Sequence, residues 1–219
     1  MVRYLAALPL LLGGAAQAQA TFYFEASTPY LSAADIPAGF YAGDAPGFLD
    51  TLEDDSLDGG LSGSAGGVIG AEDWGSYVDS VAADSPGIGR SWFNINGVGG
   101  VSFSFTGPVL PTAFGLVVTD ASGPVTFSAF DALGASLGEW TRTGFQDAGS
   151  NGGTAEDRFF GVTSAGGIAS IKVTSAGGGL ELDHLQYGQM VAAVPEPGSW
   201  ALLLAGLGAT ALRLRPRAR

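Results

Sequence analysis

The residues best suited to hold an ion are acidic side chains that gather in one short segment and recur near the end of the last predicted strand. Glu53, Asp54, Asp55 and Asp58 form the segment, and Asp183 is the later residue. Carboxylate oxygens are ligands that Ca²⁺ prefers, but the spacing is not that of an EF-hand. Two interpretations stay open: a structural calcium site that includes Glu53, Asp54 and Asp183, and a solvated acidic loop. Two further carboxylates could join the site: Asp79 and Asp84.

Aromatic residues provide a second kind of candidate site, because a flat ring with a polar edge can serve as a platform for a sugar. The candidates for a ligand-binding site are Trp92, His184 and Tyr187, with Trp74, Tyr77 and Trp140 as further members. Packing in a hydrophobic core explains the same aromatic residues equally well. Together with the acidic segment, these rings would suit a calcium-dependent carbohydrate-binding module.

Catalytic chemistry has little support in the sequence. His184 is the only histidine and cysteine is absent, which excludes a cysteine nucleophile and a metal site built from Cys or several His residues. A Ser-His-Asp triad would need His184, for example with Asp183, yet no Gly-x-Ser-x-Gly turn precedes a helix. Glycoside hydrolysis by a carboxylate pair stays an outlying alternative. We expect a protein that is not an enzyme, with Ca²⁺ in a structural role as the one cofactor the sequence suggests.

Composition and charge limit both the fold and the partners. The 219 residues include 36 Gly and 11 Pro, and 46% are hydrophobic, which is too apolar for a disordered chain. Charged residues make up only 14%, and no long helix-forming stretch lies between the two ends, so the middle should be mostly β-structure. Residues 21–190 carry 20 acidic residues and four basic ones. Such a charge opposes contact with phosphates, so no nucleic acid is expected as a partner.

Alternating apolar and polar residues, separated by Gly- and Pro-rich turns, predict about eight strands at 22–25, 101–106, 113–119, 125–128, 136–140, 158–162, 167–174 and 179–187. Weaker patterns add short strands at 48–53 and 67–70. Many short strands without intervening helices favour an all-β fold, an antiparallel two-sheet sandwich of the jelly-roll kind.

The last predicted strand changes its apolar face within a few residues. Apolar residues stand at positions 180 and 182 and then at 185 and 187, although alternation along a strand would keep them on even positions. One extra residue at Asp183–His184, a β-bulge, would reconcile the two halves. Because bulges redirect side chains, we expect Asp183 and His184 to point toward an edge or a loop.

The first 20 residues have the pattern of an export signal. Arg3 precedes an apolar run, and small residues end in Ala18-Gln19-Ala20, a site for signal peptidase. We expect residues 1–20 to be a signal peptide and residues 21–190 to form the exported domain.

Residues 191–219 combine a proline motif, an apolar segment and a basic end. Pro195-Glu196-Pro197 precedes a predicted transmembrane helix at about 198–212, and four arginines follow: Arg213, Arg215, Arg217 and Arg219. The prolines keep the motif extended. Basic residues stay on the cytoplasmic side of a membrane, so the tail points inward while the domain lies outside.

This segment resembles the PEP-CTERM sorting signal of Gram-negative bacteria, over residues 194–219. The resemblance implies that the tail holds the exported protein in the inner membrane until an exosortase, a membrane protease, processes it near Pro195-Glu196-Pro197. It also implies a final place at the cell surface or outside the cell, often in a biofilm matrix. Signal peptidase, exosortase and exopolysaccharide are therefore the expected partners.

The body resembles exported β-sandwich proteins that carry the same tail, over roughly residues 45–188. The segments that carry the likeness are 103–105, 111–112, 119–120, 130–131, 154–161 and 181–188. It implies a fold and a destination but no chemistry. We therefore expect a non-catalytic cell-surface or extracellular-matrix protein. The alternatives are a calcium-dependent carbohydrate-binding module and, as an outlier, an exported glycan hydrolase.

Overall fold

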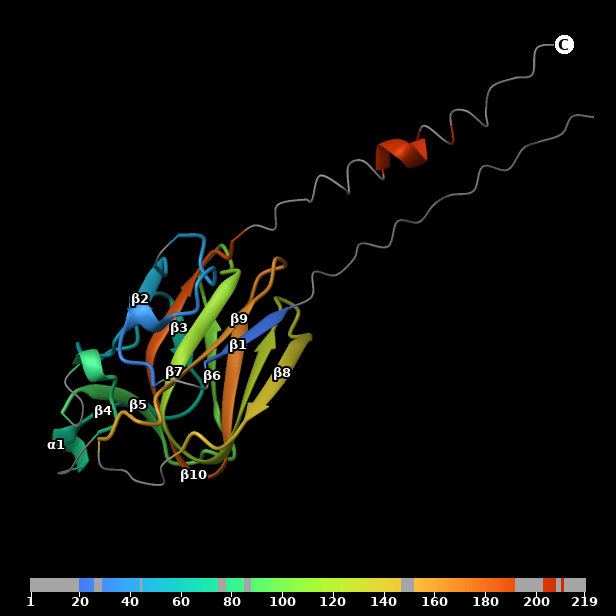
Figure 1. Cartoon of the computed structure of the whole chain (residues 1–219). Coiled ribbons are helices and arrows are strands. Elements are labelled where there is room, and N and C mark those ends of the chain that lie inside the picture. The colour runs from blue at the N-terminus through green and yellow to red at the C-terminus, as the bar shows by residue number, and fades with distance from the viewer. Residues whose placement is uncertain are drawn as a thin grey trace, which may run out of the picture.

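The computed structural model describes residues 20–25, 29–43, 45–74, 78–84, 88–146, 152–191, 203–207 and 210 (Figure 1). Several predicted features lie outside these residues: the signal peptide up to residue 19, the motif Pro195-Glu196-Pro197, and the tail arginines Arg213, Arg215, Arg217 and Arg219. Their assignment stays a prediction from the sequence.

Strands are the main secondary structure of the described domain. They are β1 (Thr21–Phe24), β2 (Phe48–Asp50), β3 (Leu61–Gly63), β4 (Gly67–Gly70), β5 (Arg90–Asn94), β6 (Val101–Phe105), β7 (Ala113–Phe130), β8 (Ser136–Arg142), β9 (Arg158–Thr163) and β10 (Ser170–Gly188). The short helices are η1 (Ala33–Asp35), α1 (Ala71–Trp74) and η2 (Ala82–Asp84). Every strand pair is antiparallel, which confirms the all-β antiparallel class.

Two long strands, β7 and β10, organise the sheet by pairing with each other along their length. On its other side β7 pairs first with β9 and then with β8, whereas β10 pairs in turn with β6, β5 and β2. Beyond these, β1, β3 and β4 lie at the margins. All ten strands therefore form one continuous sheet, and not two separate sheets as expected, because β7 and β10 run through both halves.

The long strands contain the places where the sequence predicts turns. Residues 122–124 and 175–178 separate shorter strands in the prediction, yet they lie opposite each other in the β7–β10 pair. The register shifts twice there, between Ser175 and Gly177 and between Gly177 and Leu180. Gly123 and Gly178 have positive φ angles of 81° and 62°, a conformation that suits glycine at a bulge. The chain bends at this point without leaving the ladder, so four predicted strands become two.

One hydrophobic core lies between the two halves of the sheet. It includes Phe114 from the first half of β7, Phe127 from the second half, and Phe160 from β9. The Phe127 ring lies 6.1 Å from that of Phe22 and 6.0 Å from that of Phe160, between ring centroids. The halves therefore pack face to face, as in a sandwich.

A second cluster covers the opposite face of the half that contains β9. Tyr30, Phe40 and Tyr41, from the segment after β1, pack with Val117 and Phe159. The Phe40 and Phe159 rings meet edge-on with centroids 5.1 Å apart. Residues 29–43 thus add a third layer, and polar side chains on this face of the sheet are buried as well.

The end of β10 is fastened to the domain just after Gly188. The backbone N–H of Met190 donates to Thr112 Oγ1 at 2.8 Å, and the backbone N–H of Ala42 donates to the carbonyl of Gln189 at 2.6 Å. Farther along the chain, residues 203–207 and 210 are helical. Among the residues that the structure describes, no helix is long and apolar enough to span a membrane.

Because both halves share one core, removing its central ring should destabilise the whole domain. We expect Phe127→Ala to lower the free energy of unfolding by about 3–5 kcal/mol. The control Leu133→Ala, at a side chain that is 92% exposed, should change it by less than about 0.5 kcal/mol. Denaturant unfolding of the full chain measures both, and comparable small effects would show that the two halves do not share a core.

Candidate functional site

The predicted β-bulge is present in β10 and places its polar residues. Asp183 pairs with Val117 and Gln186 pairs with Gly115, so His184 and Leu185 together stand opposite a single residue of β7. His184 has a φ of 45°, in the left-handed region. Of the two expected directions, an edge or a loop, the structure shows the second: Asp183 and His184 contact the connecting segments 29–43 and 78–84. They do not reach an edge, and they are 0% and 2% exposed because these segments cover this face.

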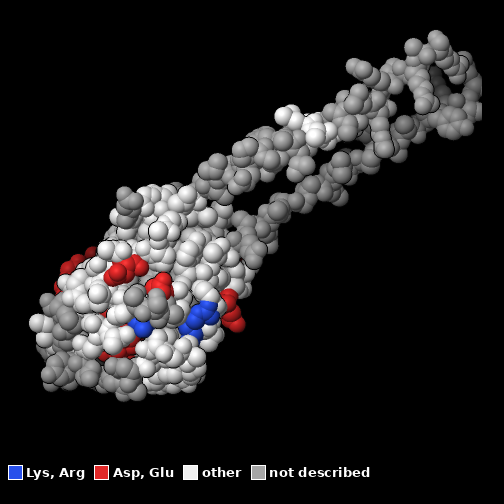
Figure 2. All heavy atoms as spheres, viewed as in Figure 1, with Lys and Arg blue, Asp and Glu red and all other residues white. Residues whose placement is uncertain are grey.

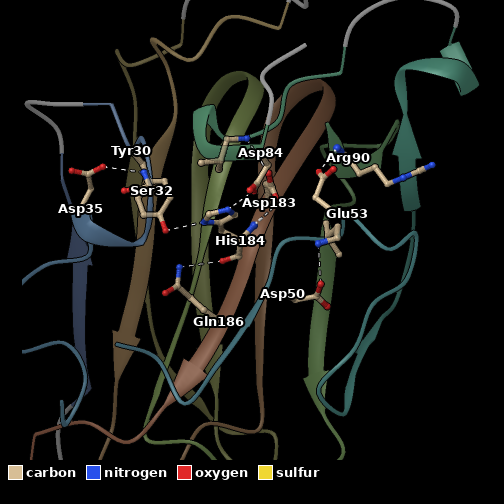
Figure 3. A network of polar contacts seen from close by, with 12 residues as sticks. Tyr30, Ser32, Asp35, Asp50, Glu53, Asp84, Arg90, Asp183, His184 and Gln186 are labelled. Atoms are coloured by element: carbon tan, nitrogen blue, oxygen red, sulfur yellow. Dashed lines mark hydrogen bonds and ion pairs between the residues drawn. The ribbon is translucent and has the colours of Figure 1, made fainter. Parts of the chain in front are cut away.

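His184 is held at both ring nitrogens (Figure 3). Nδ1 lies 2.9 Å from the hydroxyl of Tyr30, and Nε2 lies 2.5 Å from Oδ2 of Asp84, which belongs to η2. The Gln186 amide donates to the backbone carbonyl of His184 at 3.2 Å and accepts from the Tyr41 hydroxyl at 3.3 Å. Burial raises the pKa of Tyr30, which keeps its hydroxyl protonated. The His184 ring therefore connects residues 29–43, which contain Tyr30, to η2.

Two carboxylates of β10 fasten residues 78–84 to the sheet. Oε2 of Glu181 accepts the backbone N–H of Asp79 at 2.8 Å and the hydroxyl of Ser91 at 3.0 Å. Oδ2 of Asp183 accepts the backbone N–H of Val81 at 2.9 Å. Hydrogen bonds to a charged acceptor are stronger than neutral ones. The segment therefore depends on the acidic side chains beneath it.

A further buried carboxylate belongs to Asp157, immediately before β9. Its side chain is 0% exposed, and neither carboxylate oxygen has a hydrogen-bond partner among the residues that the structure describes. Burial, together with the nearby charges of Asp79, Glu156 and Asp183, raises the pKa of Asp157 to about 9. We call Asp79, Asp157 and Asp183 the inner acidic cluster.

The pKa values of two neighbouring acidic residues are also raised. Burial raises the pKa of Glu181 to about 7 and that of Asp183 to about 7, although each accepts backbone hydrogen bonds that act against the shift. Several of the acidic residues of the protein thus lie inside the domain, where burial favours their protonated form. On the face drawn in Figure 2, charged side chains are few and are separated by uncharged surface.

The structure brings together only part of the predicted calcium site. Glu53 accepts the backbone N–H of Arg90 at 2.6 Å, and its pKa responds to the charges of Asp84 and His184, so it lies near that pair. Ligand atoms of Asp84, Asp183 and His184 all lie within 4.8 Å of one another. Asp54 is apart from this group: it is exposed and accepts hydrogen bonds from Ser56.

The predicted aromatic platform is not assembled on a surface. Trp92 is 8% exposed, packs edge-on against Phe103, and donates from Nε1 to the carbonyl of Ala65 at 3.0 Å. Tyr187 stacks on Phe48 with centroids 5.1 Å apart and donates its hydroxyl to the carbonyl of Gly59 at 2.7 Å. His184 is buried too, whereas Tyr187 is half-buried at the margin of the core, so the three candidates do not form one exposed platform.

A different aromatic residue borders an open hollow at the margin of the sheet. Trp140 of β8 lines it together with Glu139 and with Thr21 and Phe22 of β1. The guanidinium carbon of Arg142 lies 3.2 Å from the centre of the Trp140 ring. A half-buried tryptophan and a carboxylate therefore border the same hollow. An aromatic ring and a hydrogen-bond acceptor are the kinds of group that can bind a sugar.

We call the polar side chains on this face of the sheet the polar centre: Tyr30, Asp84, Asp157, Glu181, Asp183 and His184. The patterns in the sequence did not identify Asp157 and Tyr30 as members of it. Asp157 directly precedes β9, in which all six residues are buried, and an acid at the start of such an apolar strand is the signal that could have marked it. Nothing near Tyr30 marks it in the sequence, because its role comes from the packing of residues 29–43 on the sheet.

Comparisons with known proteins place the chain in no family. No family model and no curated protein matches it. Among solved structures, the enzymatically active domain of tailspike protein 4 from bacteriophage CBA120 is 13% identical with a TM-score of 0.36, over 65% of this chain but only 21% of that one. The C-terminal family 22 carbohydrate-binding module of Clostridium thermocellum Xyn10B is 14% identical with a TM-score of 0.28, over 71% and 99%. Both likenesses are too distant to define an activity.

The buried acids predict an unusual dependence of stability on pH. In chelator-treated buffer we expect the free energy of unfolding to fall as the pH rises from about 5 to about 9. Asp157, Glu181 and Asp183 have folded-state pKa values above their ordinary values of 3.8 to 4.5. The folded state therefore binds more protons than the unfolded state in this range, and losing them costs about 1.4 kcal/mol per pKa unit.

Denaturant unfolding of the full chain across this pH range is the measurement. Asp157→Asn should flatten the part of the curve above about pH 7, because it removes the carboxyl group with the most strongly raised pKa. The exposed matched control, Asp54→Asn, should keep the slope. A wild-type stability that rises between these pH values would contradict the assignment.

Proposed function

We propose that the protein is an exported, non-catalytic cell-surface or extracellular-matrix protein, delivered by a PEP-CTERM signal and carrying a jelly-roll-like sandwich as its body. The observation that carries the proposal is the order of features in one chain. An export signal at 1–20 precedes the β-domain, and Pro195-Glu196-Pro197, an apolar segment and an arginine-rich end follow it. This order suits a protein that crosses the inner membrane and is then released.

The physical steps follow from the residues. Signal peptidase would cut after Ala20, and the domain would fold outside the cytoplasm. Sixteen uncharged residues lie between Glu196 and Arg213. As a helix they would measure about 24 Å, which arginine side chains can extend by reaching toward the headgroups. An exosortase would then process the chain near Pro195-Glu196-Pro197 and free the domain for the surface, with exopolysaccharide as its surroundings.

Two features of the domain support this proposal. The fastening of Gln189 and Met190 to Ala42 and Thr112 completes the domain a few residues before the motif, so processing there would leave the fold whole. The polar centre also supports a structural role, because Glu181 and Asp183 accept backbone amides and His184 contacts Tyr30 and Asp84. These groups stabilise the covering segments.

Carbohydrate binding by the body is the second candidate function, in the form of a calcium-dependent module. The hollow that Glu139 and Trp140 line is the observation that favours it. The acidic body would repel an anionic polysaccharide unless a cation bridged the two. Hydrolysis of a glycan remains the outlying alternative.

The sorting signal is tested with a reporter protein that has its own export signal and is fused to residues 194–219. In a host with an exosortase we expect the reporter to be shortened and released from the inner membrane. In the isogenic host without the enzyme it should accumulate at full length in the membrane fraction, and so should a fusion that carries Pro195→Ala, Glu196→Ala and Pro197→Ala. Immunoblots of cell fractions measure this. Equal processing in both hosts would refute the proposal.

For the second candidate, purified full chain is tested for pull-down by insoluble polysaccharides with Ca²⁺ and with chelator. We expect Trp140→Ala to weaken any binding about tenfold, equivalent to about 1.4 kcal/mol. Leu133→Ala, on the exposed turn before β8, should bind like the wild type. Binding that is indifferent to Trp140→Ala would remove the hollow as the sugar site, and release of soluble sugar would favour the hydrolase.

A further inference from the structure

The starting point is a pair of buried oxygen-bearing side chains on adjacent strands. The β7–β9 ladder ends with Val118 opposite Arg158, so Thr119 and Asp157 are opposite each other one residue farther on. Both lie on the face of Val117 and Phe159, since alternate residues of a strand share a face. Thr119 Oγ1 and both carboxylate oxygens of Asp157 are buried, with no hydrogen-bond partner among the described residues.

Two more carboxylates approach Asp157 from other segments. Asp183 of β10 pairs with Val117, next but one to Thr119 along β7. Asp79 is 2% exposed, and its backbone N–H is bound to Glu181 of β10, so it lies over the same strand. The charges of Asp79 and Asp183 both act on Asp157. The three carboxylates come from distant parts of the chain and lie on the face of the sheet that residues 78–84 cover.

The basic groups nearby bind other atoms. Arg158 belongs to the opposite face of β9, and its guanidinium donates to the backbone carbonyls of Ala155 and Asp157 at 2.9 and 2.8 Å. His184 contacts Asp84 and Tyr30 through its side chain. Among the described residues, no basic side chain donates a hydrogen bond to the carboxylate of Asp157. Several buried negative charges cost much free energy unless a positive charge compensates them.

We propose that Asp79, Asp157 and Asp183 bind one Ca²⁺ ion, with Thr119 Oγ1 as a further oxygen ligand. The donor set consists of oxygen atoms alone, which suits a hard cation and not zinc, whose sites contain nitrogen or sulfur. Ca²⁺ accepts six to eight oxygen ligands in flexible geometry, whereas Mg²⁺ requires a near-ideal octahedron and keeps several waters. The rest of the coordination shell would be backbone carbonyls or water.

The ion would have a defined structural effect. It would neutralise the inner acidic cluster and join residue 79 to β9 and β10 through side chains, in addition to the backbone hydrogen bonds that already hold residues 78–84 to β10. The inference goes beyond the proposed function, because delivery by the terminal signals does not require an ion in the body. It differs from the site predicted from the sequence: the two share Asp183 and the additional candidate Asp79, whereas Asp157 and Thr119 are new and Glu53 and Asp54 take no part.

The experiment uses the full chain after chelator treatment, with Ca²⁺ alone as the probe. Isothermal titration should show one Ca²⁺ bound per chain. The melting temperature should rise by about 5–10 °C when free Ca²⁺ exceeds the dissociation constant about a hundredfold. Mg²⁺ at the same concentration should give a smaller rise. No binding and no shift at millimolar Ca²⁺ would overturn the proposal.

Variants show whether the bound ion lies at the inner acidic cluster. Asp157→Asn should abolish the calcium-dependent shift and still fold, because it removes a buried charge. Thr119→Val, of similar shape, should weaken binding and provides a second variant. Asp54→Asn has the same chemical change at an exposed site and should bind Ca²⁺ like the wild type. If Asp157→Asn and Thr119→Val both keep wild-type affinity, the proposed ligands are wrong. The sorting assay uses only residues 194–219 of this protein, so a negative result in that assay and a negative result in the calcium experiment are independent.

Discussion

The backbone amides of Asp79 and Val81 donate to the carboxylates of Glu181 and Asp183, and the polar centre depends on these two contacts. They hold residues 78–84 against β10, which buries His184 and brings Asp79 toward Asp157. Without that cover, the acids on this face of the sheet would be hydrated and their pKa values would not be raised by burial. The same contacts thus create both the order of the segment and the electrostatic cost that a cation would relieve.

The continuous β7–β10 pair makes this arrangement possible. One face of the pair packs against the core that both halves share, and the opposite face supports the layer formed by residues 29–43. The bulge at His184 keeps Leu182 and Leu185 in the core while polar residues occupy the outer face. A sheet with one extra layer can therefore bury an acidic cluster without interrupting its apolar core, and the proposed ion would lie inside this acidic domain.

Local patterns predicted much of the fold because strand alternation and turn residues act over a few positions. They gave the positions of β1, β2, β4, β6, β8 and β9, and the bulge in β10. They missed β5, where Ser91 and Trp92 are both buried, so that alternation is absent. They also treated 122–124 as a turn, since pairing of Gly-rich segments across the sheet leaves no local signal. The site was harder to predict: Asp183 and its neighbours were visible, whereas Asp157 and Tyr30 join them only through long-range packing.

The most direct measurement is an anomalous difference map from crystals of the full chain grown with Ca²⁺. One peak should lie among the carboxylates of Asp79, Asp157 and Asp183, at the 2.3–2.6 Å ligand distances typical of Ca²⁺. It should disappear from crystals treated with chelator. A map without a peak there would contradict the proposed site and would leave protonation as the way in which the buried acids are neutralised.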